Sequence, residues 1–180
     1  MSEQEIIEFL KSQEKELKAN DLIKIYHRLN VRNAPALTQF FLDHGIDPLK
    51  YVTMIPRGYA DGLQTYYTKR IMLPDNIEGI DVFAFSHTNA TELYIPPKVY
   101  FIRDNAFSSS KLEKIYIDGA PKIQAKAFSD CKNIKKIKIE CTKEEWYKQN
   151  PAVSSERFQF EDWPYVFRDA HPDAKLMFLK

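Results

Sequence analysis

The tetrapeptide Glu-Leu-Tyr-Ile at 92–95 returns as Lys-Ile-Tyr-Ile at 114–117 and as Lys-Ile-Lys-Ile at 136–139. An earlier copy, Arg-Ile-Met-Leu, stands at 70–73, so four copies follow one another at a spacing of 22 residues. In each copy the second and fourth residues are apolar, an alternation that is typical of a β-strand with one buried face. A fixed period of a few tens of residues indicates a solenoid. These segments therefore predict four short strands stacked into one sheet.

The segments that connect these strands repeat as well. Each carries an isoleucine followed four residues later by an alanine and a phenylalanine, at Ile80-x3-Ala84-Phe85, Ile102-x3-Ala106-Phe107 and Ile123-x3-Ala127-Phe128. The spacing is 22 and then 21 residues, and the missing residue falls near 119–121. The small alanine lets neighbouring turns approach, and the phenylalanine fills the space between them. One more buried position precedes the later strands and holds Ala90, Leu112 and Ile134.

Several segments in register resemble BspA-type leucine-rich repeats. The resemblance is carried by Leu73-Pro74-Asp75-Asn76-Ile77-Glu78-Gly79-Ile80, Tyr94-Ile95-Pro96-Pro97, Phe128-Ser129-Asp130-Cys131-Lys132-Asn133-Ile134 and the closing Cys141-Thr142-Lys143-Glu144-Glu145-Trp146. What it implies is a one-sided sheet used for protein binding. The family is best known from surface proteins of bacteria and protozoa, and it also occurs in small intracellular and mobile-element proteins. The chain differs from the surface members in its few repeats and in its acidic start, which lacks a secretory-signal pattern.

Helical patterns precede the repeats and would cover the first open end of the ladder. The first predicted helix has a capping box of Ser2 and Glu5 and an apolar stripe of Ile6, Ile7 and Leu10. The second begins at Asn20 and presents Leu22, Ile25, Tyr26 and Leu29. The third presents Leu37, Phe40 and Phe41 and ends at Gly45, after which Asp47-Pro48 starts a short helical turn.

Aromatic residues are dense after the repeats. Phe158 and Phe160 lie 21 residues beyond Ile137 and Ile139, which makes them a predicted fifth rung or closing strand. Tyr165, Phe167, Met177 and Leu179 are candidates to extend it. These side chains either cover the last repeat or, in part, form a partner site, because exposed aromatic residues are favoured as interface anchors.

We therefore expect an α+β protein built around a short leucine-rich-repeat solenoid of about four 22-residue rungs. A helical N-terminal subdomain would occupy residues 1–62, the repeats residues 63–146 and an aromatic C-terminal cap residues 147–180.

Composition narrows the function classes. The 180 residues carry a net charge of +1, with 28% charged and 44% hydrophobic residues, as is usual for a folded globular protein. Cys131 and Cys141 are too few for a disulfide framework or a zinc site and fit a reducing compartment. No apolar stretch approaches membrane-spanning length. We expect a cytoplasmic protein that does not interact with membranes.

The outward residues of the predicted strands form the candidate partner-binding site. One column holds Met72, Tyr94, Tyr116 and Lys138, and the column two residues earlier holds Arg70, Glu92, Lys114 and Lys136. An aromatic stripe beside a mainly basic one suits an acidic partner. The alternative is that Tyr94 and Tyr116 are only a cross-strand pair that stabilises the sheet and that the lysines keep it soluble.

Other chemistries find little support in the sequence. Residues 111–148 contain ten lysines against six acidic residues, yet no nucleic-acid recognition motif frames them. No nucleophile with a neighbouring base, paired carboxylates, metal-ligand spacing or glycine-rich phosphate loop is present, so no catalytic residue, metal or cofactor is assigned. Cys131 is expected to pack in the core.

The sequence thus predicts a non-enzymatic protein–protein interaction scaffold that binds through the exposed sheet face. A small inhibitor or adaptor, of the kind that phages and mobile elements encode, which occludes a host enzyme or its nucleic-acid site, stays open as a second interpretation. An enzyme with an unrecognised site is a third. The partner and the oligomeric state are not specified.

Overall fold

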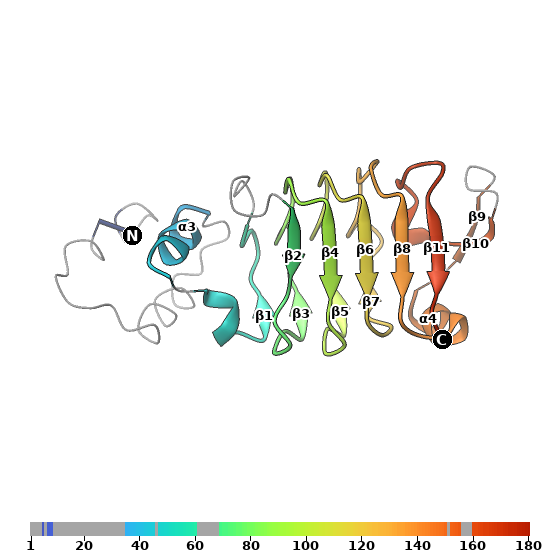
Figure 1. The fold of residues 1–180 in the computed structure, drawn as a ribbon, viewed down its shortest axis with the longest axis horizontal. Coiled ribbons are helices and arrows are strands. Elements are labelled where there is room, and N and C mark those ends of the chain that lie inside the picture. The colour runs from blue at the N-terminus through green and yellow to red at the C-terminus, as the bar shows by residue number, and fades with distance from the viewer. Residues whose placement is uncertain are drawn as a thin grey trace.

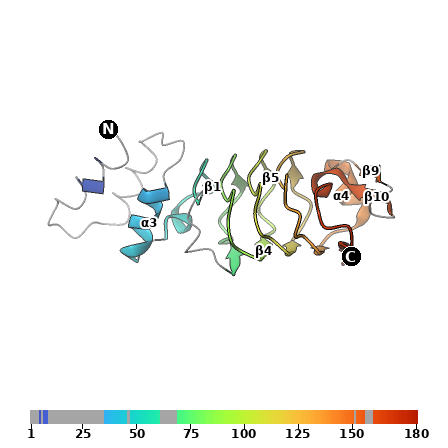
Figure 2. The same ribbon diagram turned by 90° about the horizontal axis from the view of Figure 1, so that it is seen from above.

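The chain forms a solenoid whose coils follow one another along one axis (Figure 1). The computed structural model describes Glu5, Ile7, Glu8 and residues 35–45, 47–60, 69–150, 152–155 and 160–180. Seen from above, the long and the short strands lie on different sides of the stack (Figure 2). The predicted leucine-rich-repeat solenoid is therefore confirmed.

The long strands form a five-stranded parallel sheet in the order β11-β8-β6-β4-β2. Their bounds are β2 (Arg70–Met72), β4 (Glu92–Ile95), β6 (Lys114–Ile117), β8 (Lys136–Ile139) and β11 (Lys175–Phe178). The register follows the 22-residue period, with Leu93 opposite Ile115 and Ile115 opposite Ile137. The four strands predicted from the repeat are thus in place, and β11 adds a fifth.

The short strands form a second parallel sheet in the order β1-β3-β5-β7. Their bounds are β1 (Met54–Ile55), β3 (Gly79–Ile80), β5 (Phe101–Ile102) and β7 (Lys122–Ile123). Each coil therefore consists of a long strand, a turn, a short strand and a return segment. The turn before β7 spans residues 118–121, one residue fewer than the turn at 96–100 before β5, and it contains Gly119 with a φ of 99°. This explains the single 21-residue interval.

A ladder of stacked phenylalanines fills the return side of the core. The ring centroids of Phe85 and Phe107 are 5.5 Å apart and those of Phe107 and Phe128 are 5.1 Å apart, with planes within 5° of parallel. Ala84, Ala106 and Ala127, which precede these rings, are fully buried. The predicted roles of the alanine and the phenylalanine are confirmed, because one permits close approach of the coils and the other fills the space between them.

Helical segments lie before the first coil. Helix α3 (Pro35–Asp43) is followed by Gly45 at a φ of 72°, and Asp47 caps the 3-10 helix η1 (Pro48–Tyr51) by accepting a 3.0 Å hydrogen bond from the backbone N–H of Leu49. The predicted third helix and the turn after it are confirmed. The two earlier predicted helices lie outside the described residues, apart from Glu5, Ile7 and Glu8.

Helix α4 (Lys143–Gln149) follows the last repeat and closes the short sheet. Thr142 and Glu145 form its capping box, and its Trp146 is fully buried. Asn150, directly after the helix, accepts a 3.0 Å hydrogen bond from the N–H of Ile123 and donates one of 2.9 Å to the carbonyl of Pro121. Its side-chain amide thus takes the place of a neighbouring strand beside β7.

The fifth strand of the long sheet is formed by other residues than the predicted Phe158 and Phe160. Phe160 lies in β10 (Phe160–Pro164), which pairs antiparallel with β9 (Ala152–Ser155) in a separate sheet, and Phe158 lies outside the described residues. After the 3-10 helix η3 (Tyr165–Phe167), β11 joins the long sheet with Leu176 opposite Ile137. The 21-residue spacing of Phe158 and Phe160 misled because two alternating aromatic residues fit any half-buried strand, whichever sheet it joins.

Candidate functional site

The candidate site is the outward face of the five-stranded sheet, defined here as three rows of residues that cross the strands. The first row is Arg70, Glu92, Lys114, Lys136 and Lys175. The second row is Met72, Tyr94, Tyr116, Lys138 and Met177. The third row, just beyond, includes Asp118, Glu140 and Leu179, as shown by backbone hydrogen bonds of 2.8–3.0 Å from each of them to the strand before. Alternation along each strand holds these residues outward while their neighbours enter the core.

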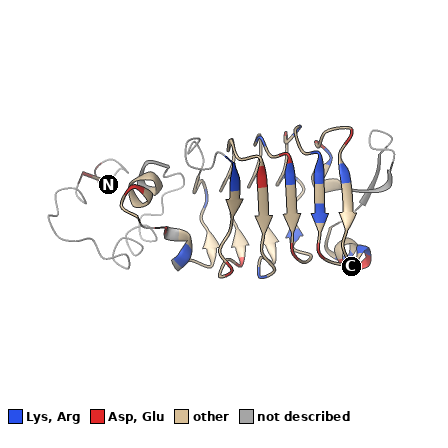
Figure 3. Ribbon diagram, viewed as in Figure 1, with Lys and Arg blue, Asp and Glu red and all other residues tan. Residues whose placement is uncertain are grey.

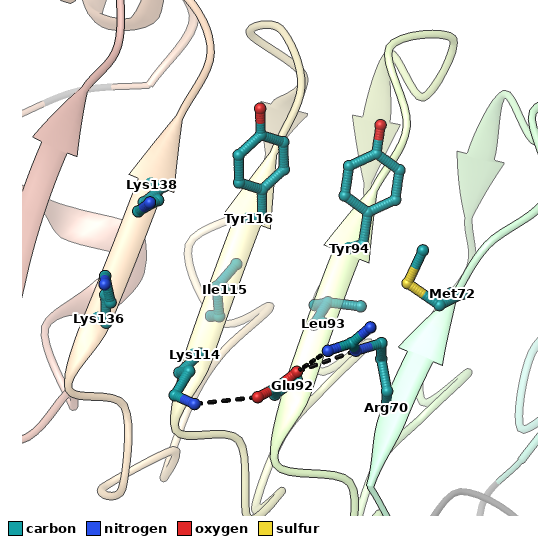
Figure 4. A pocket seen from close by; sticks show the side chains of 10 residues that line it. All are labelled: Arg70, Met72, Glu92, Leu93, Tyr94, Lys114, Ile115, Tyr116, Lys136 and Lys138. Carbon is teal, nitrogen blue, oxygen red and sulfur yellow. Dashed lines mark hydrogen bonds and ion pairs between the residues drawn. The ribbon is translucent and has the colours of Figure 1, made fainter.

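All eight residues that the sequence singled out line one open hollow of about 320 Å³ (Figure 4). They come from β2, β4, β6 and β8. The structure therefore brings together the residues predicted for the site, and its rigid sheet sets their order and spacing.

An ionic network occupies one end of the first row. The Arg70 guanidinium lies 2.6 Å from a carboxylate oxygen of Glu92, and the Lys114 ammonium lies 3.0 Å from the other (Figure 4). The hydrogen bond from Lys114, followed by that from Arg70, lowers the pKa of the Glu92 carboxyl below its ordinary value. One carboxylate thus holds two cations, which the sequence pattern of a mainly basic stripe did not reveal.

The two tyrosines of the second row stack on each other. Their ring centroids are 5.3 Å apart with planes 20° from parallel, and both side chains are half-buried. Figure 4 shows both pointing away from the ionic network. The cross-strand contact on which the alternative interpretation rests is thus present, and the two stacked rings stand at the centre of the face.

The tyrosine hydroxyls stay protonated at neutral pH. The Tyr116 hydroxyl donates a 2.7 Å hydrogen bond to Glu140, which together with burial raises the pKa of Tyr116 to about 12. Burial, and then the nearby Asp118 carboxylate, raise the pKa of Tyr94 as well. Both rings therefore present neutral hydroxyl groups toward the acidic third row.

Sulfur-containing side chains lie at both ends of the second row. Met72 is 56% exposed at one end of the second row, and Met177 is 37% exposed at the other. Exposed, flexible methionines adapt to different partner surfaces. The second row is thus apolar or aromatic except at Lys138.

Basic residues dominate the other end of the face. Lys136 and Lys175 are exposed, and Lys138 is half-buried. Across the described part of the chain, none of these three lysines forms an ion pair. Figure 3 shows the basic first row crossing the sheet, interrupted by Glu92 on β4.

Sequence reasoning missed Lys175 and the acidic part of the third row, and it named Met177 only as a candidate to extend the closing strand. Lys175 and Met177 follow the insertion that contains α4, β9 and β10, so no repeat spacing pointed to them. Asp118 and Glu140 do keep the 22-residue spacing, and this signal could have identified them.

A second hollow, of about 490 Å³, lies where the turns meet α4. Two of the carboxylates that line it already serve the fold, since Glu140 accepts a hydrogen bond from Tyr116 and Glu145 belongs to the capping box of α4. Asp118 of the third row also lines it. Lys148 lies 3.5 Å from Glu144. This hollow is therefore a weaker candidate than the outward face.

The described residues contain neither a cluster suited to bind a metal ion nor, at Cys131, a reactive thiol. Within the described ranges, no three His, Cys, Asp or Glu side chains gather closely enough to hold a metal ion. Cys131 is fully buried, its thiol lies 3.0 Å from the carbonyl of Phe107, and burial raises its pKa to about 11. A buried thiol of high pKa is a poor nucleophile, which agrees with its predicted place in the core.

Comparison with known proteins identifies the repeat. The family model described as BspA type leucine rich repeat region (6 copies) matches residues 63–150. No curated protein and no solved structure shows significant similarity to the chain. Of the helices that the structure describes, none has both the length and the apolarity needed to cross a membrane.

Proposed function

Residues 63–150 belong to the family of BspA-type leucine-rich repeats, and on that premise we propose that the protein is a non-enzymatic protein-interaction module. Repeats of this family are associated with protein interaction and are typically non-catalytic. The partner binds the outward face of the five-stranded sheet and carries an acidic surface. The observation that carries this proposal is the stacked Tyr94–Tyr116 pair, which lies between an exposed methionine and lysines that have no carboxylate partner among the described residues.

The stacked tyrosines are the proposed anchors. Large aromatic side chains supply much of the binding free energy of protein interfaces. Because Tyr94 and Tyr116 are already held against each other, they lose little side-chain entropy when a partner covers them. Met72 extends this apolar centre toward β2.

Charged residues of the first and second rows orient the partner. Lys136 and Lys138 attract its acidic groups and raise the association rate. Arg70, Glu92 and Lys114 hold one another in place, so this end of the face offers a fixed pattern of charges rather than a free positive patch. The role of these side chains is recognition rather than chemistry.

Inhibition of a host enzyme is one form that such binding can take. An inhibitor of this kind would act by covering the active site or nucleic-acid site of its partner. The distinction between inhibitor and adaptor is made by measuring the activity of the purified partner with and without one equivalent of this protein. Loss of activity at equimolar ratio identifies an inhibitor, and unchanged activity identifies an adaptor.

Site-specific photo-crosslinking tests the proposed face. A photoreactive phenylalanine analogue replaces Met72 on the outward face or, as the matched control, Tyr100 directly before β5 of the short sheet; the two side chains are 56% and 62% exposed. After irradiation in a lysate of the source cells, we expect one defined crosslinked protein from position 72 and none from position 100. The same product from both positions, or a product from position 100 alone, would contradict the proposed face.

A further inference from the structure

Three lysines meet where β8 and β11 run side by side. Lys136 and Lys175 are register partners on these neighbouring parallel strands, so their backbones are about 4.8 Å apart. Lys138 follows Lys136 by two residues on the same face of β8, about 6.6 Å further along the strand. Figure 4 shows Lys136 and Lys138 on the same side of the sheet as Tyr116. The three form a small triangle, which we name the lysine triad.

None of the three triad lysines forms an ion pair within the described residues. Glu92 is bound to Arg70 and Lys114, and Glu140 accepts the hydroxyl of Tyr116. Like charges on adjacent strands destabilise a sheet. The triad thus opposes folding slightly, and an external anion would relieve the repulsion.

We propose that Lys136, Lys138 and Lys175 form a carboxylate-binding subsite that takes an acidic segment of the protein partner, an inference that rests on the proposed function. The segment places at least two carboxylates on the triad and an apolar side chain on the neighbouring Tyr116 and Met177. Strand β11, which lies beyond the matched repeats, then forms part of the binding surface besides closing the solenoid.

The surroundings of the triad favour a protein segment over a nucleic acid. Nucleic-acid platforms stack bases on open aromatic faces. Here the faces of Tyr94 and Tyr116 that meet are covered by each other. Asp118 and Glu140 in the third row would also repel a continuous phosphate backbone. A protein segment with acidic residues on one side and apolar residues on the other suits both neighbours of the triad.

A titration with a short acidic peptide tests the triad directly. The probe is end-blocked hexaglutamate, added at low ionic strength while the side-chain signals of the lysines are followed by NMR. We expect the largest shifts at the three triad lysines and smaller shifts at Lys114, which is paired with Glu92. Lys175→Gln should weaken binding about five-fold, as loss of one exposed charge contact of about 1 kcal/mol predicts.

The control is Lys122→Gln, which makes the same charge change on β7 of the short sheet. We expect it to leave hexaglutamate binding almost unchanged. Equal weakening by Lys122→Gln and Lys175→Gln, or no binding of hexaglutamate, would overturn the proposal. So would tighter, triad-dependent binding of hexathymidylate, which would identify a nucleic-acid site, or equal binding of inorganic phosphate, which would identify a simple anion site.

Two further measurements are needed. One tests whether a triad lysine is required for folding, and the other tells failure of the subsite apart from failure of the proposed function. Lys136→Gln should leave the melting temperature unchanged or raise it, because it removes repulsion; a fall of several degrees would show that Lys136 is needed for folding and would overturn the subsite. If Lys175→Gln leaves partner binding intact while Tyr94→Ala/Tyr116→Ala abolishes it, the subsite is wrong and the proposed function stands. If the tyrosine variant also binds normally, the proposed function fails.

Discussion

Asn150 shows how a single side chain can complete a sheet. Its fully buried amide pairs with the carbonyl of Pro121 and the N–H of Ile123, two groups that would otherwise lack partners at the edge of β7. At the opposite end of the repeats, the Asn76 side chain donates to the carbonyls of Leu49 and Val52 and so ties the helical turn η1 to the first coil. Asn150 thus satisfies backbone groups that a longer solenoid would pair with another coil, and Asn76 satisfies carbonyls at the end of a helical turn.

Removal of the Asn150 amide should destabilise the fold strongly. In Asn150→Ala the two buried backbone groups lose their partners, at about 1–3 kcal/mol each. We expect the free energy of unfolding, measured with urea, to fall by about 2–6 kcal/mol. The exposed Asn133 provides the control, and Asn133→Ala should change it by less than about 0.5 kcal/mol. Equal unfolding midpoints for the two variants would show that the amide has no such role.

The Tyr116 hydroxyl should lose its proton only at high pH. Its ordinary pKa of 10.0 is raised to about 12, chiefly by the hydrogen bond to Glu140. Between these values the unfolded chain releases a proton that the folded chain keeps, so the free energy of unfolding falls as the pH rises from 10 toward 12. Glu140→Gln removes the carboxylate charge and should lower the pKa of Tyr116 toward its ordinary value.

This pKa is measured by NMR of the tyrosine ring carbons during an alkaline titration. The Tyr94 signal serves as an internal comparison, because burial rather than a hydrogen bond to Glu140 is the main cause of its raised pKa. An unchanged pKa of Tyr116 in Glu140→Gln would contradict the assigned hydrogen bond.

For individual residues, the sequence predicted which side chains face outward and in which order they follow one another across the sheet. It could not identify the partners of those residues. That Glu92 would bind both Arg70 and Lys114 depends on the strand register and on side-chain rotamers, which a 22-residue spacing alone does not specify. For the same reason, the sequence could not show that Lys136, Lys138 and Lys175 form no ion pair within the described residues.

The elements owe their stability to contacts between successive coils. Each phenylalanine of the return ladder packs between two rings. The ladder begins with Tyr59, whose ring centroid lies 5.8 Å from that of Phe85, and ends with the tilted ring of Phe167, whose centroid lies 5.0 Å from that of Phe128. Repeat proteins gain stability from such nearest-neighbour interfaces. A gap in the middle of the ladder therefore weakens two interfaces at once.

Truncation of the central ring tests this coupling. Phe107→Ala should lower the free energy of unfolding by about 3–5 kcal/mol, since it removes a fully buried ring that stacks on both sides. The exposed Tyr100 is the control, and Tyr100→Ala should have little effect. Guanidinium unfolding followed by circular dichroism measures both. A loss of less than 1 kcal/mol in Phe107→Ala would mean that the ladder contributes less than its burial suggests.

The attachment of β11 can be tested by hydrogen exchange. The backbone N–H of Lys175 donates a 2.9 Å hydrogen bond to the carbonyl of Lys135, and that of Leu179 donates one of 3.0 Å to the carbonyl of Ile139. We expect both amides to exchange as slowly as that of Glu140, which bonds to Ile117 one coil earlier. Exchange within seconds, alongside a protected Glu140, would show that β11 is not a stable part of the sheet.

The strands of the repeats were predictable because period-two alternation and a fixed spacing reinforce each other over four copies. Strand β11 was not, because it follows an insertion and carries no repeat spacing. Its place depends on tertiary contacts, including that of Phe178 with the buried Trp146, whose ring centroids are 6.4 Å apart. Sequence periodicity locates elements within an array and says little about a strand that returns to it.

The whole molecule presents an outward face with a graded charge. The first row is basic, the second row is aromatic and apolar at its centre, and the third row is acidic at Asp118 and Glu140 (Figure 3). A partner that lies across these rows contacts a basic, an aromatic and an acidic row in turn. The face therefore determines the orientation of the partner as well as its affinity. The net charge of +1 gives no hint of this arrangement, because it is summed over the whole chain and does not report where the charges lie.

The most direct test of the account is quantitative capture of partners from a lysate of the source cells by three forms of the protein. These are the wild type, Tyr94→Ala/Tyr116→Ala on the outward face and Tyr100→Ala away from it, each first shown to be folded by circular dichroism. We predict one protein that the wild type and Tyr100→Ala capture equally and that the double variant loses, with an affinity reduced more than about 30-fold for a loss of 2 kcal/mol or more. Capture of the same protein at full strength by the double variant would contradict the central claim that the outward face is the binding site.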